Sequence, residues 1–492
     1  MNATTTFEAV SRTPPTLDES IDVHAVRHPN RVLRPVQALT ERRTATTPDP
    51  TSAGNKTAVD SQEMGVTNVG LSVVERCRAF VASKFGGNLL YTSSGFVAYQ
   101  SGYWSGVDVA TVMKPALLQF LGDEAEVRDI EQMMAMLRIS KASRINPYDT
   151  ISHLICLQNG TLDPLSCTLR PNSPTDYLSN RREIAWDPEA ACPRWVQALE
   201  EFFAPDGDRQ AKIDLLQEFI GYCLIPDTSM HKFLWLVGGG ANGKSVVLKV
   251  LTEVVGSANV NHAELSRLGS KFARAELQGK LLNISAEMPT TINDSYLKQI
   301  VAGDVTEAER KYQASFSFKP TARLVGATNA LPRLRDYSEG FRRRAIILTF
   351  NRQFAESEQD RELAEKLLEE LPGILVWAAA GLRRLKERGS FVLPPSSVAA
   401  LDDYRRDSNP VRQFEEELLE DVDNVASGLA ASAMYKAYEQ WRTARGHERL
   451  SESLFKQRLA MLGHEQRRGR AGRFWMLRMR QSGGSVEAEA AG

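Results

Sequence analysis

The chain has 492 residues, of which 42% are hydrophobic and 25% are charged, and its formal net charge is −1. This composition is ordinary for a soluble folded protein, and the length is enough for about three domains. Because the net charge is close to zero, a global positive field is excluded, and any contact with nucleic acid must come from local basic patches.

The five cysteines are far apart in the sequence, and none forms a CxxC pair. This spacing excludes a zinc ribbon built from closely paired ligands, and the odd number favours reduced thiols in a cytosolic compartment. The N-terminus lacks the apolar segment of a secretory signal, and no apolar run reaches the ~18 residues that span a bilayer. We therefore expect a cytoplasmic protein without a membrane segment.

The first part of the chain divides into an arm and a small domain. Residues 1–68 are rich in Thr, Pro, Ser and Arg and show no apolar period, which predicts a disordered arm. This arm is either a solvated tail or a binding segment. Residues 69–204 are expected to form a mainly helical domain used for oligomerisation, with a small hairpin over 89–104 and helices over 107–140.

The middle of the chain alternates between short apolar runs and amphipathic segments. Strands are predicted over 233–237, 280–284, 322–326 and 345–350, and a helix over 245–255. Strand–helix–strand alternation of this kind predicts an α/β fold with a largely parallel sheet and helices on its faces.

The rest of the chain is predicted to be mostly helical and to end in short strands. Helices are expected over 361–386, 411–421 and 428–445, and the last strand over 473–478. The expected units are an ATPase domain with a helical lid over 205–405, a winged-helix-like domain over 406–481, and a disordered tail over 482–492.

A glycine-rich loop follows the first of these strands and opens the helix. Gly238-Gly-Gly-Ala-Asn-Gly-Lys244-Ser245 fits G-x-x-x-x-G-K-[ST], which cradles the phosphates of a nucleoside triphosphate. Glycines let the backbone approach the phosphates, Lys244 reaches the β- and γ-phosphates, and the Ser245 hydroxyl binds Mg²⁺. The alternative is a glycine-rich turn without function. The expected nucleotide-binding residues are Gly238, Gly240, Asn242, Gly243, Lys244 and Ser245.

Two further polar residues follow predicted strands. Glu287 ends the strand after the loop, where an acid would orient water and hold Mg²⁺ together with Ser245. Asn329 ends the next strand, where an amide would position the attacking water without adding charge. The alternatives are a solvated glutamate and a turn residue before Pro332.

Three adjacent arginines, Arg342 to Arg344, precede the last predicted strand of the sheet. One of them could stabilise transition-state charge at the site of a neighbouring subunit. The alternative is a positively charged strand entry or a salt-bridged surface.

The order of these motifs resembles superfamily 3 helicases, and most closely the helicase part of phage and plasmid primase-helicases, a group that includes poxvirus relatives. The likeness covers about residues 70–480. It includes Ile284-Ser-Ala-Glu287, Leu297-Lys-Gln-Ile-Val-Ala-Gly-Asp304, Gly326-Ala-Thr-Asn-Ala-Leu-Pro332 and Phe341-Arg-Arg-Arg-Ala345.

The resemblance implies an AAA+-like P-loop core and a role for each motif. Glu287 would be the Walker B acid, Asn329 sensor 1, and Arg343 or Arg344 the finger acting in trans. Arg310, Lys311 and Lys319 would belong to a hairpin that lines a DNA channel, the alternative being an exposed basic loop.

Two features depart from the family pattern. Ala286 stands where many relatives carry a second Walker B acid, which puts the metal shell in doubt. Fewer than 70 low-complexity residues stand where relatives have a primase domain, so priming is not expected from this chain.

The C-terminal segment is locally basic, since residues 449–480 contain nine basic and two acidic side chains. Arg467, Arg468 and Arg470 surround a glycine-containing turn, and we expect them to contact DNA phosphates; the alternative is a solvated face. Tyr435, Tyr438 and Trp441 repeat at helical spacing and are expected in the core.

We therefore expect an ATP- and Mg²⁺-dependent DNA helicase of a phage, plasmid or related mobile element. It would translocate on single-stranded or forked DNA as a homo-oligomeric ring, expected to be a hexamer, with a separate primase or host replication proteins as partners. The alternatives are an ATP-switched origin-binding initiator without processive unwinding, and a degenerate ATPase that serves as an interaction platform.

Overall fold

The computed structural model describes residues 71–150, 152–287, 291–292, 294–312, 315–334, 339–407, 409–447, 449–469 and 472–480. The expected arm over 1–68 and the tail over 482–492 lie outside these residues. No helix within the described ranges is long and apolar enough to cross a bilayer.

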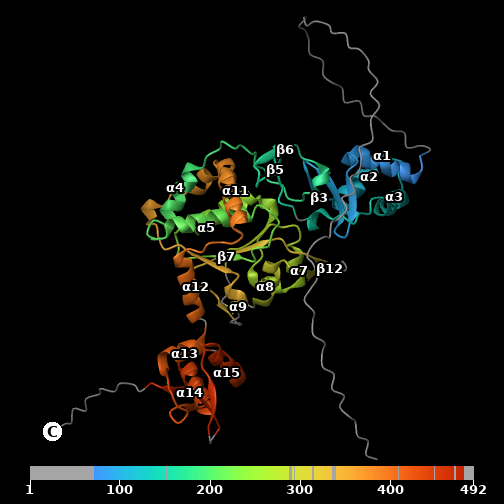
Figure 1. The fold of residues 1–492 in the computed structure, drawn as a ribbon. Helices are drawn as coiled ribbons and strands as arrows, with labels where there is room; N and C mark the ends of the chain where they lie inside the picture. Colours follow the sequence, from blue (N-terminus) through green and yellow to red (C-terminus); the bar gives the residue numbers. More distant parts are fainter. Residues whose placement is uncertain are drawn as a thin grey trace, which may run out of the picture. The chain divides into compact units, whose positions relative to one another are not determined.

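The first part of the described chain packs three helices against a small sheet (Figure 1). Ser72 and Glu75 form a capping box at the start of the first helix, and Gly86 ends it in a left-handed conformation. The expected hairpin gains a third strand, so the sheet has the antiparallel order β1-β2-β3. The elements are α1 (Val73–Phe85), β1 (Leu89–Thr92), β2 (Gly95–Gln100), β3 (Tyr103–Gly106), a π-helical turn (Val109–Met113), α2 (Lys114–Leu121) and α3 (Val127–Ser140).

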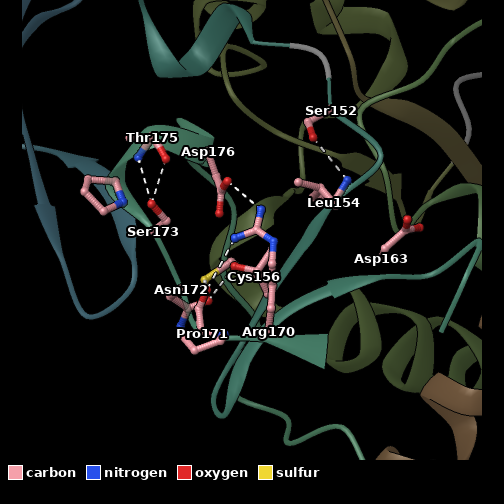
Figure 2. Close-up of polar contacts among 12 residues, drawn as sticks. Ser152, Leu154, Cys156, Asp163, Arg170, Pro171, Asn172, Ser173, Thr175 and Asp176 are labelled. Carbon is pink, nitrogen blue, oxygen red and sulfur yellow. Dashed lines mark hydrogen bonds and ion pairs between the residues drawn. The ribbon is translucent and has the colours of Figure 1, made fainter. Parts of the chain in front are cut away.

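A second three-stranded sheet follows, in a domain that was expected to be mainly helical. Its antiparallel strands are β4 (Ile155–Leu157), β5 (Gly160–Asp163) and β6 (Thr168–Arg170). Arg170 pairs with Asp176 at 2.6 Å, which ties the loop after β6 back to the sheet (Figure 2). Strands of three or four residues are too short to show a period of two, so this sheet left no clear pattern in the sequence.

The central sheet has five parallel strands in the order β15-β7-β13-β9-β8. The prediction of a parallel sheet is therefore confirmed. If the five strands of this sheet are numbered along the chain, their spatial order is 5-1-4-3-2. The fourth strand, β13, lies between β7 and β9 and pairs with both. The strands are β7 (Phe233–Val237), β8 (Val260–Asn261), β9 (Leu282–Ser285), β13 (Arg323–Thr328) and β15 (Ala345–Thr349).

Each face of this sheet is covered by helices (Figure 1). Successive residues of β7 alternate between two cores: Leu234 and Leu236 belong to one, Phe233 and Trp235 to the other. The first core includes α4 (Pro193–Phe202), α5 (Arg209–Tyr222), α6 (Lys244–Val255), α10 (Leu363–Leu368) and α11 (Leu371–Arg388). The second includes α7 (Lys271–Ala275), α8 (Asp294–Ala302), α9 (Glu339–Arg342) and α12 (Pro395–Asp407).

A buried ion pair fixes α5 to the carboxyl end of β15. The Lys212 ammonium is fully buried and donates to the Asp206 carboxylate at 2.9 Å and to the Thr349 hydroxyl at 2.8 Å. Because the chain after Thr349 passes beside the glycine-rich loop, this anchor fixes one wall of the site described below.

Two short strand pairs complete the middle of the chain. The hairpin of β11 (Thr306–Ala308) and β12 (Phe316–Phe318) is antiparallel, and β10 (Thr291–Ile292) pairs in parallel with β14 (Arg333–Leu334).

The C-terminal unit has its own hydrophobic core. Tyr438 and Trp441 are buried in it and Tyr435 packs against it, so their assignment to the core is confirmed. Its elements are α13 (Pro410–Leu418), β16 (Leu419–Asp421), β17 (Leu429–Ala430), α14 (Ala431–Ala444), α15 (Glu452–Met461), β18 (Gln466–Gly469), β19 (Gly472–Trp475) and β20 (Leu477–Met479).

Candidate functional site

The glycine-rich loop runs from the end of β7 to the start of α6. Gly243 precedes the helix with a φ of 92°, and a Cβ atom there would lie 2.7 Å from the Phe202 ring. A Cβ at Gly238 would lie 2.3 Å from the Phe350 carbonyl oxygen. Gly239 and Gly240 have open space around the Cβ position. Packing therefore requires the outer two glycines, whereas the inner two leave room for a ligand.

The Lys244 ammonium is held inside the loop. It donates to the carbonyl oxygens of Gly238 at 2.7 Å and Gly239 at 2.8 Å, and to the Asn242 side-chain oxygen at 3.0 Å. Asn242 is buried, and its side-chain Nδ2 donates to the Gly239 carbonyl oxygen at 2.6 Å. Burial lowers the pKa of the Lys244 ammonium below its ordinary value. Among the described residues this cation has no carboxylate partner, so an anion entering the loop would meet an uncompensated charge.

The loop opens onto a cavity of about 1140 Å³ at the carboxyl ends of the parallel strands. Lys244, Ser245, Glu287 and Asn329 all line it. Ser245, Glu287 and Asn329 are exposed. Glu287 follows β9, and its backbone carbonyl oxygen accepts a hydrogen bond from the Ser285 hydroxyl at 2.6 Å. Because β7, β13 and β9 are neighbours, their carboxyl ends bring together residues that are far apart in the chain. Of the expected binding set, Gly238 does not line the cavity, whereas Gly240, Asn242 and Gly243 do.

The far part of the cavity was not anticipated from the sequence. Arg194, Glu201 and Phe202 line it from α4, and Phe354, Glu358, Gln359, Asp360 and Leu363 line it from the segment after β15 and the start of α10. These residues belong to no motif. Phe202 and Phe354 have the apolar character of ordinary core positions, so no pattern in the sequence distinguishes them as residues of a ligand site.

The three adjacent arginines lie at the amino-terminal ends of the strands, opposite the carboxyl ends where the cavity is. Arg344 precedes Ala345, which pairs with Phe233 at the amino-terminal end of β7. The five residues of β15 therefore place about 16 Å of strand between these arginines and the carboxyl edge. Arg343 is exposed, while Arg344 donates to Gly340 O at 2.8 Å. Burial, and secondarily the charge of Arg343, lowers the pKa of Arg344. Neither arginine lines the cavity of its own chain.

The cations expected to contact DNA differ in their surroundings. Arg310 donates to the Gln278 side chain at 2.8 Å and stacks on Phe316 at 4.7 Å, so it braces the β11–β12 hairpin. Lys311 is exposed shortly after β11, and Lys319 is exposed directly after β12.

The C-terminal arginines lie on the β18–β19 hairpin. Arg467 and Arg468 are exposed, and Arg468 lies directly opposite Arg473 in the antiparallel register. Like charges in this position repel each other, and a bound anion would relieve the repulsion. Arg470 lies outside the described residues.

The described residues hold no cluster of three His, Cys, Asp or Glu side chains able to bind a metal ion on its own. All five cysteines are free thiols. A divalent cation at the cavity would therefore need ligands from its nucleotide as well as from Ser245 and Glu287.

Three family models match successive parts of the chain. The model "D5 N terminal like" matches residues 93–204, the family of unknown function DUF5906 matches residues 236–344, and the model "Poxvirus D5 protein-like" matches residues 406–488.

Similar proteins are found among viral proteins named as putative helicases. One from Acanthamoeba polyphaga mimivirus is 23% identical over 322 residues, covering 60% of this chain and 33% of that protein. One from Frog virus 3 is 26% identical over 241 residues, covering 43% of this chain and 24% of that protein. The chain thus spans a third or less of the length of these relatives.

A solved structure shares the fold. The apo structure of the NrS-1 C-terminal region is 10% identical with a TM-score of 0.50, and the match covers 82% of this chain and 99% of that one. The two D5-type matches lie on either side of residues 236–344. Together with the viral relatives, they show that this chain is a relative of the poxvirus-type primase-helicases.

Proposed function

We propose that this chain, a relative of the poxvirus-type primase-helicases, is an ATP-dependent DNA helicase of superfamily 3 that serves the replication of a phage, plasmid or related mobile element. One observation carries the proposal: the glycine-rich loop, Glu287 and Asn329 line a single cavity at the carboxyl edge of a parallel sheet. Ligands of open α/β sheets bind at this edge. The chain order and strand order fit an AAA+-like P-loop core.

The residues at the loop fit a magnesium nucleotide. Lys244, which here donates to loop carbonyls and to Asn242, would turn to the β- and γ-phosphates. Ser245 and Glu287 would hold Mg²⁺, with water completing the shell because Ala286 offers no ligand. When bound, Mg²⁺ neutralises charge that develops on the phosphate oxygens.

Glu287 and Asn329 would act on the attacking water. The exposed Glu287 carboxylate accepts a proton or orients the water, while the Asn329 amide positions it without adding negative charge. Both residues come from strand ends on the same side of the loop, which suits in-line attack on the γ-phosphate.

The arginines suit an active site shared between subunits. Because Arg343 and Arg344 lie at the opposite edge of the sheet from their own cavity, either would serve as a finger only in the cavity of a neighbour. We propose a ring, expected to be a hexamer, in which residues 69–204 assist oligomerisation and residues 205–405 form the motor.

DNA contact is assigned to two regions. Lys311 and Lys319 on the β11–β12 hairpin would meet single-stranded DNA in the ring, with Arg310 bracing the hairpin. Residues 406–481 would form a winged-helix-like domain whose Arg467, Arg468 and Arg470 meet DNA phosphates at a fork. A separate primase or host replication proteins remain the proposed partners.

The test is displacement of a labelled strand from forked DNA by the purified full-length chain. Lys244→Ala, Glu287→Gln and Arg343→Ala should each abolish displacement. Lys249→Ala, which changes an exposed lysine on α6 that does not line the cavity, is the matched control and should displace normally. ATP turnover without displacement would favour the origin-binding initiator instead.

A mixing experiment tests the shared site. Arg343→Ala subunits are titrated into wild-type protein at constant total concentration. If the arginine acts in trans, displacement should fall more steeply than the wild-type fraction, because one defective boundary stalls a ring. A fall in simple proportion would argue against a finger from the neighbour.

A further inference from the structure

The cavity continues well past the glycine-rich loop, between two walls that no motif identifies. One wall is α4, and the other is the segment that runs from the end of β15 to α10. Both walls reach the loop: the Phe202 ring packs on Gly243, and the Phe354 backbone N–H donates to Ala241 O at 2.8 Å. A group that extends from phosphates held by the loop toward α4 would therefore enter the space between these walls.

Two aromatic rings meet edge to face where the two walls join, one from each wall. The Phe202 and Phe354 rings are perpendicular, with an interplanar angle of 88° and centroids 5.9 Å apart. Phe202 is buried under the loop, whereas Phe354 is half-buried and lines the cavity. Phe202 is thus a fixed base for the wall, and Phe354 is the ring with surface left for a ligand.

Arg352 fixes the orientation of the Phe354 ring. Its guanidinium stacks on the ring at 4.2 Å, donates to the Glu201 carbonyl oxygen at 3.1 Å, and donates to the Glu358 carboxylate at 3.3 Å. Arg352 does not line the cavity, so it backs the ring rather than filling the space in front of it. The Gln359 side chain adds a bond to Phe354 O at 3.1 Å.

The Phe354 ring is held by Phe202 and Arg352, and the surface that these two residues leave lines the cavity. Nucleobases stack on such rings, and a guanidinium behind the ring strengthens the platform. We propose that Phe354 is the stacking surface for the base of the nucleotide, with Arg352 as its positioning residue. This assignment rests on the proposed function, since it concerns the same cavity.

The test separates the base from the phosphates. Binding of ATP and of inorganic tripolyphosphate, each with Mg²⁺, is measured by calorimetry on the full-length chain. Stacking of one base is worth ~1–3 kcal/mol, so Phe354→Ala should weaken ATP binding by about five-fold or more. Tripolyphosphate, which has no base, should bind the variant within about two-fold of wild type.

Matched variants distinguish stacking from a general disturbance. Phe354→Tyr keeps the ring and should restore most of the ATP affinity, whereas Phe354→Leu keeps the apolar bulk and should not. Phe272→Ala removes a half-exposed ring on α7 that is remote from the cavity, and should change neither ligand. Arg352→Gln should weaken ATP and spare tripolyphosphate.

Two results would overturn the assignment alone. One is Phe354→Ala weakening both ligands equally, which would make the ring a support of the loop. The other is ATP affinity unchanged in Phe354→Ala. If the wild-type chain failed to bind ATP at all, the proposed function would fall and the base platform with it.

Discussion

Replacing Gly243 by alanine should destabilise the folded chain by about 2–4 kcal/mol. The φ of 92° lies in the left-handed region, where a Cβ costs ~1 kcal/mol. The added Cβ would also lie 2.7 Å from the Phe202 ring, which is 2% exposed and cannot move into solvent. Overpacking of this kind costs ~1–3 kcal/mol.

The assay is urea unfolding of the full-length chain, comparing midpoints at constant slope. Gly240→Ala is the matched control: it lies in the same loop, has open space at the Cβ position, and has no positive φ. It should keep the free energy of unfolding within ~0.5 kcal/mol of wild type. A double-mutant cycle with Phe202→Leu should recover about 1 kcal/mol or more of the loss.

Two outcomes would refute this reasoning. If Gly243→Ala lost less than ~0.5 kcal/mol, neither the left-handed backbone nor the ring contact would matter as argued. If Phe202→Leu added its own cost without coupling, the ring could not be the group that excludes a side chain at Gly243.

Three other predictions follow from the packing. Lys212→Met, which leaves the buried Asp206 carboxylate without its cation, should cost about 3–5 kcal/mol in urea unfolding, whereas Lys366→Met at an exposed pair should leave the unfolding midpoint nearly unchanged. Burial raises the pKa of Tyr438 to about 12, so the folded chain keeps this proton at a pH where the unfolded chain, with a tyrosine pKa of ~10, has lost it. The free energy of unfolding should therefore decrease as the pH rises from ~10 to about 12, and it should decrease less steeply in Tyr438→Phe; unfolding measured as a function of pH tests this. Arg468→Ser removes the repulsion from Arg473, so it should leave the thermal stability equal or slightly higher. The same change should reduce the slope of log affinity for DNA against log salt concentration by about one.

Much of the central sheet could be predicted from the sequence. The run of apolar residues over 233–237 matches β7 at both ends, and the run over 345–350 matches β15 to within one residue. Buried parallel strands are apolar on both faces, so their sequences are nearly continuous apolar runs that stand out between glycines. Loop residues at the ends of such strands converge, which is why Lys244, Glu287 and Asn329 line one cavity.

The rest depends on tertiary neighbours that one sequence does not reveal. The strand order, with β13 between β7 and β9, is set by packing against helices on both faces. Phe354 lines the cavity only because the chain after β15 returns over the loop, and Arg310 is engaged only because Gln278 reaches it from another segment. Local periodicity carries no information on these encounters.

The most direct measurement is steady-state ATP hydrolysis by the purified full-length chain, with and without single-stranded DNA. We expect turnover that DNA stimulates and that Lys244→Ala and Glu287→Gln each reduce by about a hundredfold or more. Turnover that is absent with DNA present, or that persists after the loss of Lys244, would contradict the assignment of the glycine-rich loop as the site of an ATP-driven motor.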